Sequence, residues 1–144
     1  MKRTAKQLLC GLFAILMVSS LLHTSAFVRS SMYLDGYAAA VTPQSGGKIA
    51  VTVDVSGVGK QAVIGSNLIY IYESKDGSYF YKVKTYKAED YPEMLSSGTY
   101  YYDTPVKYSG KPGYYYKASV YCYAGDGTNG DERNYTTSAK RAIA

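Results

Sequence analysis

The amino-acid sequence predicts an all-β fold, an antiparallel sandwich of two sheets with about seven strands that follows a helical signal peptide. Three observations favour this fold. Apolar and polar residues alternate along several runs, which is the period of a strand. Turn-forming pairs such as Asp76-Gly77 and Pro112-Gly113 separate the runs. Beyond the leader, no segment has sustained helical spacing.

The first 26 residues are typical of a secretory signal peptide. Basic residues come first, an apolar run covers Leu8–Leu22, and Thr24–Ala26 supplies the small residues of a cleavage site. The apolar run is short for a membrane-spanning helix. We therefore expect residues 1–26 to be removed and the protein to be secreted or displayed at the cell surface. The alternative is an uncleaved anchor in which Leu8–Val28 crosses the membrane.

The composition argues against a nucleic-acid partner. Three of the 16 basic side chains lie in the leader, which leaves 13 against 11 acidic ones, and no run of like charges concentrates them. Tyrosine is the unusual residue, with 18 copies beside three Phe and no Trp. Because tyrosine favours strands and has a polar tip, this composition suits sheets whose outer faces are half wet.

The sandwich domain is expected to cover residues 48–144. Residues 27–47 are weakly patterned, and they form either a tether or a first edge strand over Tyr37–Thr42. The first clear strand is Lys48–Ser56, because every second residue from Ile49 onward is apolar. Its apolar face should be buried.

Two strands and a hairpin follow. Asn67–Ser74 is apolar on both faces, which favours a central position in a sheet. Lys75–Ser78 contains Asp-Gly and predicts a tight hairpin turn into a returning strand over Tyr79–Tyr86. Strict alternation divides that strand into one face with Tyr79, Tyr81 and Val83, and another with Phe80, Lys82 and Lys84.

The next segment crosses between layers. Residues 87–98 contain several acids and a helical turn near Pro92. Pro105 then splits two short edge strands, Thr99–Asp103 and Val106–Tyr108. Beyond Ala124, residues 125–131 are interpreted as a flexible polar loop, and Tyr135–Ala142 as the last strand.

The central strand of the fold is expected at Tyr114–Ala124, directly after the Pro112-Gly113 turn. One face contains Tyr116, Ala118, Val120 and Cys122, and the other contains Tyr115, Lys117, Ser119, Tyr121 and Tyr123. The first face resembles a core and the second a wet surface. Cys122 is the lone cysteine after the leader, so no internal disulfide forms and the thiol is interpreted as a small buried hydrophobe.

The pattern Lys111-Pro112-Gly113 followed by Tyr116, Ala118 and Val120 resembles the turn and strand of fibronectin type III domains, within the immunoglobulin-like sandwiches. The resemblance implies that Tyr116 forms a corner whose hydroxyl bonds back to the nearby backbone. One departure is the missing Trp, which the family usually places on the strand matching Ile49–Val55. The resemblance implies a binding or spacing role and assigns no site.

The sequence argues against an enzyme. Its only histidine is His23, in the leader, so the exported part lacks the usual general base, metal ligand and nucleophile partner. We expect no cofactor and no metal. Two alternatives are weighed and set aside as solvated loops: a glycosidase-like carboxylate pair among residues 89–93, and a calcium site in Asp126–Glu132.

The remaining candidate is a binding surface. Its predicted members are Tyr115, Tyr121, Tyr123, Lys117, Lys82 and Lys84, with Tyr70, Tyr72, Tyr79 and Tyr81 flanking the hairpin. Rings interleaved with lysines favour contacts with a protein or with a cell-wall or glycan ligand. The alternative interpretation is sheet stabilisation by cross-strand aromatic pairs. A second functional hypothesis is a structural envelope domain held by the uncleaved leader.

Overall fold

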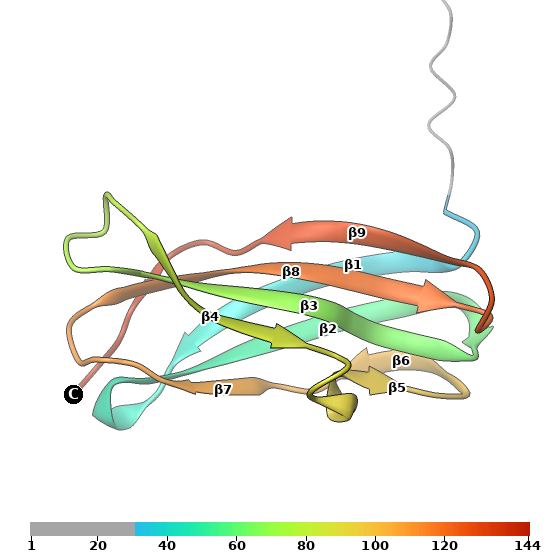
Figure 1. The fold of residues 1–144 in the computed structure, drawn as a ribbon, viewed down its shortest axis with the longest axis horizontal. Helices are drawn as coiled ribbons and strands as arrows, with labels where there is room; N and C mark the ends of the chain where they lie inside the picture. The colour runs from blue at the N-terminus through green and yellow to red at the C-terminus, as the bar shows by residue number, and fades with distance from the viewer. Residues whose placement is uncertain (1–30) are drawn as a thin grey trace, which may run out of the picture. The chain divides into compact units, whose positions relative to one another are not determined.

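The computed structural model describes residues 31–144, so the predicted signal peptide and the start of the predicted tether lie outside the described residues. The predicted all-β sandwich is confirmed, since two antiparallel sheets of four and six strands pack face to face (Figure 1). Two of the ten strands, β5 and β10, are only two residues long. Within residues 31–144, no helix is long and apolar enough to cross a membrane.

The four-stranded sheet has the order β1-β2-β6, and β7 also pairs with β2. Its strands are β1 (Leu34–Pro43), β2 (Lys48–Gln61), β6 (Thr99–Asp103) and β7 (Val106–Ser109), with a short 3-10 turn, η1 (Ser45–Gly47), between β1 and β2. The predicted first edge strand is thus present as β1. Pro105 separates β6 from β7 at the opposite edge, as expected for a residue that cannot donate to a ladder.

The six-stranded sheet has the order β10-β8-β3-β4, while β5 pairs with β3 and β9 pairs with β8. Its strands are β3 (Val63–Ser74), β4 (Tyr81–Lys87), β5 (Leu95–Ser96), β8 (Tyr115–Gly125), β9 (Gly130–Thr136) and β10 (Lys140–Arg141), and η2 (Pro92–Met94) precedes β5. The long β3–β8 pairing lies at the centre, which confirms the predicted central position of both strands (Figure 1).

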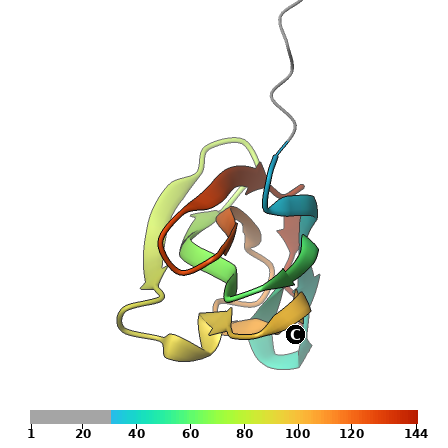
Figure 2. The same ribbon diagram turned by 90° about the vertical axis from the view of Figure 1, so that its right-hand side faces the viewer.

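The core lies between the two inner faces, which the strands surround when they are seen end-on (Figure 2). On β2, the alternating residues Ile49, Val51, Val53 and Val55 are fully buried, and on β8 so are Tyr116, Ala118, Val120 and Cys122. The predicted alternation is therefore confirmed on both strands. Burial raises the pKa of the Cys122 thiol to about 12. Each buried branched side chain contributes about 1.5–3 kcal/mol, so packing stabilises a fold without a disulfide.

The C-terminal part differs from the prediction. Strand β9 begins at Gly130, inside the segment interpreted as a loop, and the predicted strand Tyr135–Ala142 is replaced by the end of β9 and the short β10. The reason is a tight connection over residues 126–129. The Asp126 N–H donates to the Asn129 carbonyl at 2.9 Å, and the Asp126 carboxylate accepts the Thr128 N–H at 2.8 Å. This closed turn lets polar residues enter the sheet directly.

The hairpin between β3 and β4 is present, but its connection, residues 75–80, is longer than the predicted turn Lys75–Ser78. The Asp76 carboxylate accepts the Ser78 N–H at 2.8 Å and the Ser74 hydroxyl at 3.0 Å, and Gly77 has a φ of 82°. These hydrogen bonds lower the pKa of Asp76 and stabilise a wider loop. As a result β4 begins at Tyr81 and not at Tyr79.

Candidate binding face

The outer face of the six-stranded sheet gathers most of the predicted binding residues. On β8, the residues from Tyr115 to Tyr123 alternate between this face and the core. On the neighbouring strand β3, Tyr72 lies opposite Lys117 and Tyr70 lies opposite Ser119. Because paired residues in an antiparallel ladder point to the same side, the tyrosines of both strands share this face.

The rings on this face contact one another. The Tyr70 ring meets the Tyr121 ring edge to face, with centroids 6.0 Å apart at 89°, and the Tyr72 ring with centroids 6.5 Å apart at 67°. Ser119 lies opposite Tyr70 and is small, which leaves room for that ring between Lys117 and Tyr121. Such edge-to-face pairs are worth about 0.5–1.5 kcal/mol each beyond their buried area. The rings therefore form a fixed row.

Three cations lie over aromatic rings of this face. The Lys82 ammonium is 4.6 Å from the Tyr70 centroid, and the Lys117 ammonium is 4.3 Å from that of Phe80 and 5.9 Å from that of Tyr72. The Arg141 guanidinium lies 6.0 Å from the Tyr115 centroid. All are within the range of cation–π attraction. We call this surface the aromatic–basic face, which comprises Tyr70, Tyr72, Phe80, Tyr115, Tyr121, Tyr123, Lys82, Lys117 and Arg141.

Tyrosines at both ends of the face are held by glycines. The Tyr115 ring packs on Gly77 of the β3–β4 loop, and the Tyr123 ring lies against Gly125 and Gly130 of the β8–β9 hairpin. A side chain at Gly130 would overlap the Tyr123 ring. Tyr115, Tyr121 and Tyr123 are all half-buried.

Lys84 does not belong to this face, which corrects its predicted position beside Lys82. In the β3–β4 ladder, Tyr72 pairs with Lys82 but the preceding residue Ile71 pairs with Lys84. Val83 is therefore an extra residue in a β-bulge of β4. Lys84 consequently pairs with the buried Ile71, and its ammonium lies over other rings, described below. Strict alternation holds only while a strand has no bulge.

Two predicted tyrosines lie apart from the aromatic–basic face, and one residue of that face was not predicted. Tyr79 and Tyr81 are 74% and 71% exposed near the β4 edge. Arg141 was not predicted, because β10 is a two-residue strand with no alternation that could reveal its face. The alternation of β4 predicts that Phe80 shares the face of Lys82, and its contact with Lys117 agrees with that prediction.

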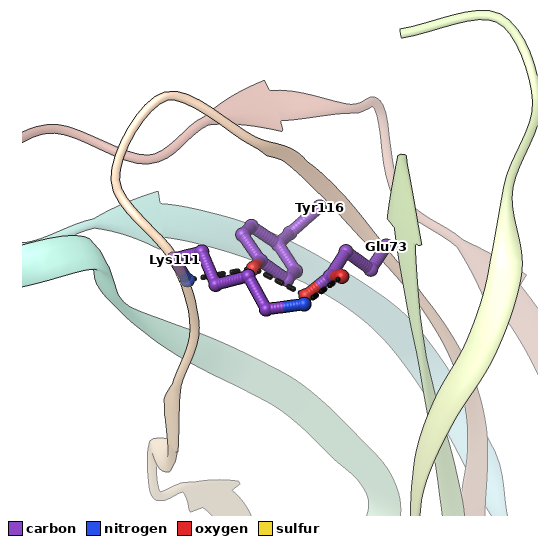
Figure 3. A network of polar contacts seen from close by, with 3 residues as sticks. All are labelled: Glu73, Lys111 and Tyr116. Carbon is purple, nitrogen blue, oxygen red and sulfur yellow. Dashed lines mark hydrogen bonds and ion pairs between the residues drawn. The ribbon is translucent and has the colours of Figure 1, made fainter. Parts of the chain in front are cut away.

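Tyr116 lies on the opposite, inner side of β8 and makes a closed polar network (Figure 3). Its hydroxyl accepts the Lys111 backbone N–H at 2.8 Å and donates to Glu73 at 2.6 Å. The Lys111 ammonium meets the other Glu73 oxygen at 2.8 Å. Burial raises the pKa of Tyr116, and the contact with Glu73 raises it further. Burial also opposes ionisation of Glu73, but hydrogen bonds from Lys111 and Tyr116 outweigh it and lower its pKa.

Several of the acidic residues considered for catalysis or calcium are engaged in protein contacts. Glu89 pairs with Lys87 at 3.1 Å on the surface. Asp126 accepts the Tyr33 hydroxyl at 2.8 Å, and Asp131 accepts the Ser31 hydroxyl at 2.6 Å. Hydrogen bonds from the Asn129 and Thr128 N–H groups lower the pKa of Asp126 to about 2. Among residues 31–144, no three His, Cys, Asp or Glu side chains are grouped so that they could hold a metal ion.

The aromatic–basic face offers two kinds of contact group. Lys82, Lys117 and Arg141 can donate hydrogen bonds to anions, and the tyrosine hydroxyls can donate or accept. Comparison with protein-family models, with curated proteins and with solved structures found no match to this chain. The role of the chain is therefore inferred from its fold and from this face.

Proposed function

We propose that this protein is a secreted, non-catalytic binding module that attaches through its aromatic–basic face to an acidic polymer of the cell wall or cell surface. The observation that carries this proposal is the row of cations, Lys82, Lys117 and Arg141, held over adjoining rings on one face. Because each cation already lies against a ring, its side chain loses little conformational entropy when a ligand binds. The cations are then ready to meet a series of negative groups.

The charges favour an acidic ligand over a neutral sugar. A neutral sugar that stacks needs an open ring face, but Lys82 covers Tyr70 and Lys117 covers Phe80. An anion, in contrast, adds charge-assisted hydrogen bonds to the same ammonium groups. One exposed ion pair is worth only about 0–1 kcal/mol, so useful affinity requires several pairs along one polymer.

The fold supports a further part of the proposal, a fibronectin type III-like arrangement. The order β1-β2-β6 resembles strands A, B and E of such sandwiches, and β4-β3-β8-β9 resembles C′, C, F and G. Tyr116 stands near the start of β8 and its hydroxyl bonds to the backbone five residues upstream, as in a tyrosine corner at the start of strand F. The aliphatic inner side of β2 replaces the family's usual Trp.

Binding to immobilised polygalacturonate, with uncharged dextran as the reference polymer, tests this proposal. The exported protein should bind only the acidic polymer, and its affinity should fall at least tenfold between 50 and 300 mM salt, because the contacts are ionic (both concentrations and the factor are rough values). The double variant Lys82→Gln/Lys117→Gln should lose roughly tenfold in affinity.

The matched control is Lys48→Gln/Lys60→Gln, which removes the same charge from exposed lysines of β2 in the other sheet. This control should retain the affinity of the unmodified protein. An equal loss in both double variants would show binding by net charge alone and contradict the proposed face. Equal binding to dextran would contradict the acidic ligand.

Export can be tested separately. N-terminal sequencing of the exported protein should give a first residue near Phe27, as the signal-peptide pattern predicts. A protein that retains Leu8–Leu22 would support the alternative function, a structural envelope domain held in the membrane by its leader. The polymer-binding experiment applies to both forms.

A further inference from the structure

A cavity of about 150 Å³ lies away from the aromatic–basic face, between the β4 edge of one sheet and the β6–β7 edge of the other. Tyr86, Met94 and Tyr102 are buried in its walls, and Tyr91 and Val106 complete the apolar part of the lining. The Tyr86 and Tyr91 rings meet at 5.0 Å between centroids. A cavity of this volume is known to hold one benzene-sized ring.

The hydroxyls of the two buried wall tyrosines, Tyr86 and Tyr102, are already hydrogen-bonded. The Tyr86 hydroxyl donates to the Lys107 carbonyl at 3.0 Å, and the Tyr102 hydroxyl donates to the Glu93 carbonyl at 3.0 Å. Burial raises the pKa of both phenols, so they remain neutral donors. The walls therefore present ring surface and sulfur, which suit an apolar ring.

The charges around the cavity favour an anion. The Lys84 ammonium lies 5.2 Å from the Tyr86 centroid and 5.8 Å from that of Tyr91, beside the lining. Lys107 contributes its backbone carbonyl, and its exposed side chain is on the outer side of β7. Neither lysine forms an ion pair with any residue in the described range 31–144. Glu93 is the one carboxylate in the lining. Since Lys84 occupies the position over the rings that a ligand's cation would take, an ammonium ligand is disfavoured.

We propose that this cavity binds a small monocyclic aromatic carboxylate, with the ring against Tyr86, Tyr91 and Met94 and the carboxylate directed to Lys84. The size of the cavity limits the ligand to one ring. The β-bulge at Val83 is what brings Lys84 to this side of β4. This site is independent of the polymer-binding proposal, because it uses none of the residues of the aromatic–basic face.

Methionine methyl NMR of the exported protein provides a direct test with benzoate as the probe. Once the leader is removed, only Met32 and Met94 remain. Met94 is 1% exposed in the cavity wall, whereas Met32 is 76% exposed and acts as an internal reference. Benzoate should shift the Met94 methyl signal with a Kd on the order of 1 mM, as expected for so small a ligand. The Met32 signal should not move.

Two variants and two further probes decide the chemistry. Lys84→Gln should weaken benzoate about threefold to tenfold and leave benzyl alcohol unchanged, while Lys82→Gln, on the same strand before the bulge, should change neither. Val106→Phe should fill the cavity and abolish the Met94 shift. Benzylamine that binds as tightly as benzoate would overturn the assignment, as would a Met94 signal that stays fixed up to roughly 20 mM benzoate.

Discussion

The two outward faces of the sandwich differ sharply although both arise from the same alternation of residues. The six-stranded sheet presents rings and cations, as described above. On the four-stranded sheet, small residues of β1 face small or polar residues of β2, with Gly36 opposite Ser56 and Ala40 opposite Thr52. This difference teaches that alternation identifies an outer face, whereas the size and charge of its residues decide whether it can hold a ligand.

The largest expected effect on the free energy of unfolding comes from the inner side of β8, with which the two outer faces can be compared. Tyr116→Phe removes the hydroxyl that joins the Lys111 N–H to Glu73, and it leaves partly buried polar groups without a partner. We expect a loss of about 1–3 kcal/mol in the free energy of unfolding, measured with urea. Tyr108→Phe is the matched control, since that ring packs on Tyr116 at 5.9 Å; it should stay within about 0.5 kcal/mol.

The rings of the outer face give the next effect. A double-mutant cycle of Tyr70→Ala and Tyr121→Ala should yield a coupling energy of about 0.5–1.5 kcal/mol in urea unfolding, because their rings meet edge to face. Thr52→Ala on the outer side of β2 should change stability by less than about 0.5 kcal/mol. A coupling near zero would mean that the rings of the six-stranded sheet add no more to the free energy of unfolding than the small residues of the other outer face.

The end of the sandwich where the β8–β9 hairpin holds Ser31–Tyr33 should respond to acid. The pKa of Asp126 is lower in the folded chain, about 2, than its ordinary 3.8. The stability that ionised Asp126 adds to the folded chain is therefore complete above the pKa of the unfolded chain. It is lost as the pH falls through the pKa of the folded chain, between about pH 5 and pH 2. The urea midpoint should decrease over this range, and less so in Asp126→Asn. A midpoint that falls equally in both proteins would assign the acid response to other carboxylates.

The smallest effect belongs to the four-stranded face. Tyr101 lies opposite Ser56 and donates to Asp54 at 2.7 Å, and this hydrogen bond raises the pKa of Tyr101 to about 12. The tyrosine Cζ signal that disappears in Tyr101→Phe should titrate near pH 12, and Asp54→Asn should move that titration to lower pH. An unchanged titration in Asp54→Asn would show that the hydrogen bond does not persist in solution.

The sequence is sufficient to predict the sandwich because its longest strands follow strict alternation. The inner residues of β2 and β8, Cys122 included, are where the pattern places them. The same reasoning brings together Tyr115, Tyr121, Tyr123, Lys82 and Lys117 on one face. Each of these predictions depends only on local period and on turn residues, which a single sequence contains.

The remaining features depend on tertiary pairing. The bulge at Val83 has no Gly or Pro to mark it, so alternation carried Lys84 to the wrong face. Arg141 joins the aromatic–basic face through two residues of pairing between β10 and β8. The cavity likewise requires the edges of two sheets to meet, which no local pattern reveals.

The bulge at Val83 has one more consequence, for the tendency of the protein to self-associate. β4 is an edge strand with exposed apolar side chains at Tyr81 and Val83, and a straight strand of this kind is a template for pairing with another molecule. The extra residue bends the strand and breaks its hydrogen-bonding register, while two lysines flank the bend. The bulge that places Lys82 and Lys84 on two surfaces thus also makes the β4 edge a poor template for intermolecular strand pairing.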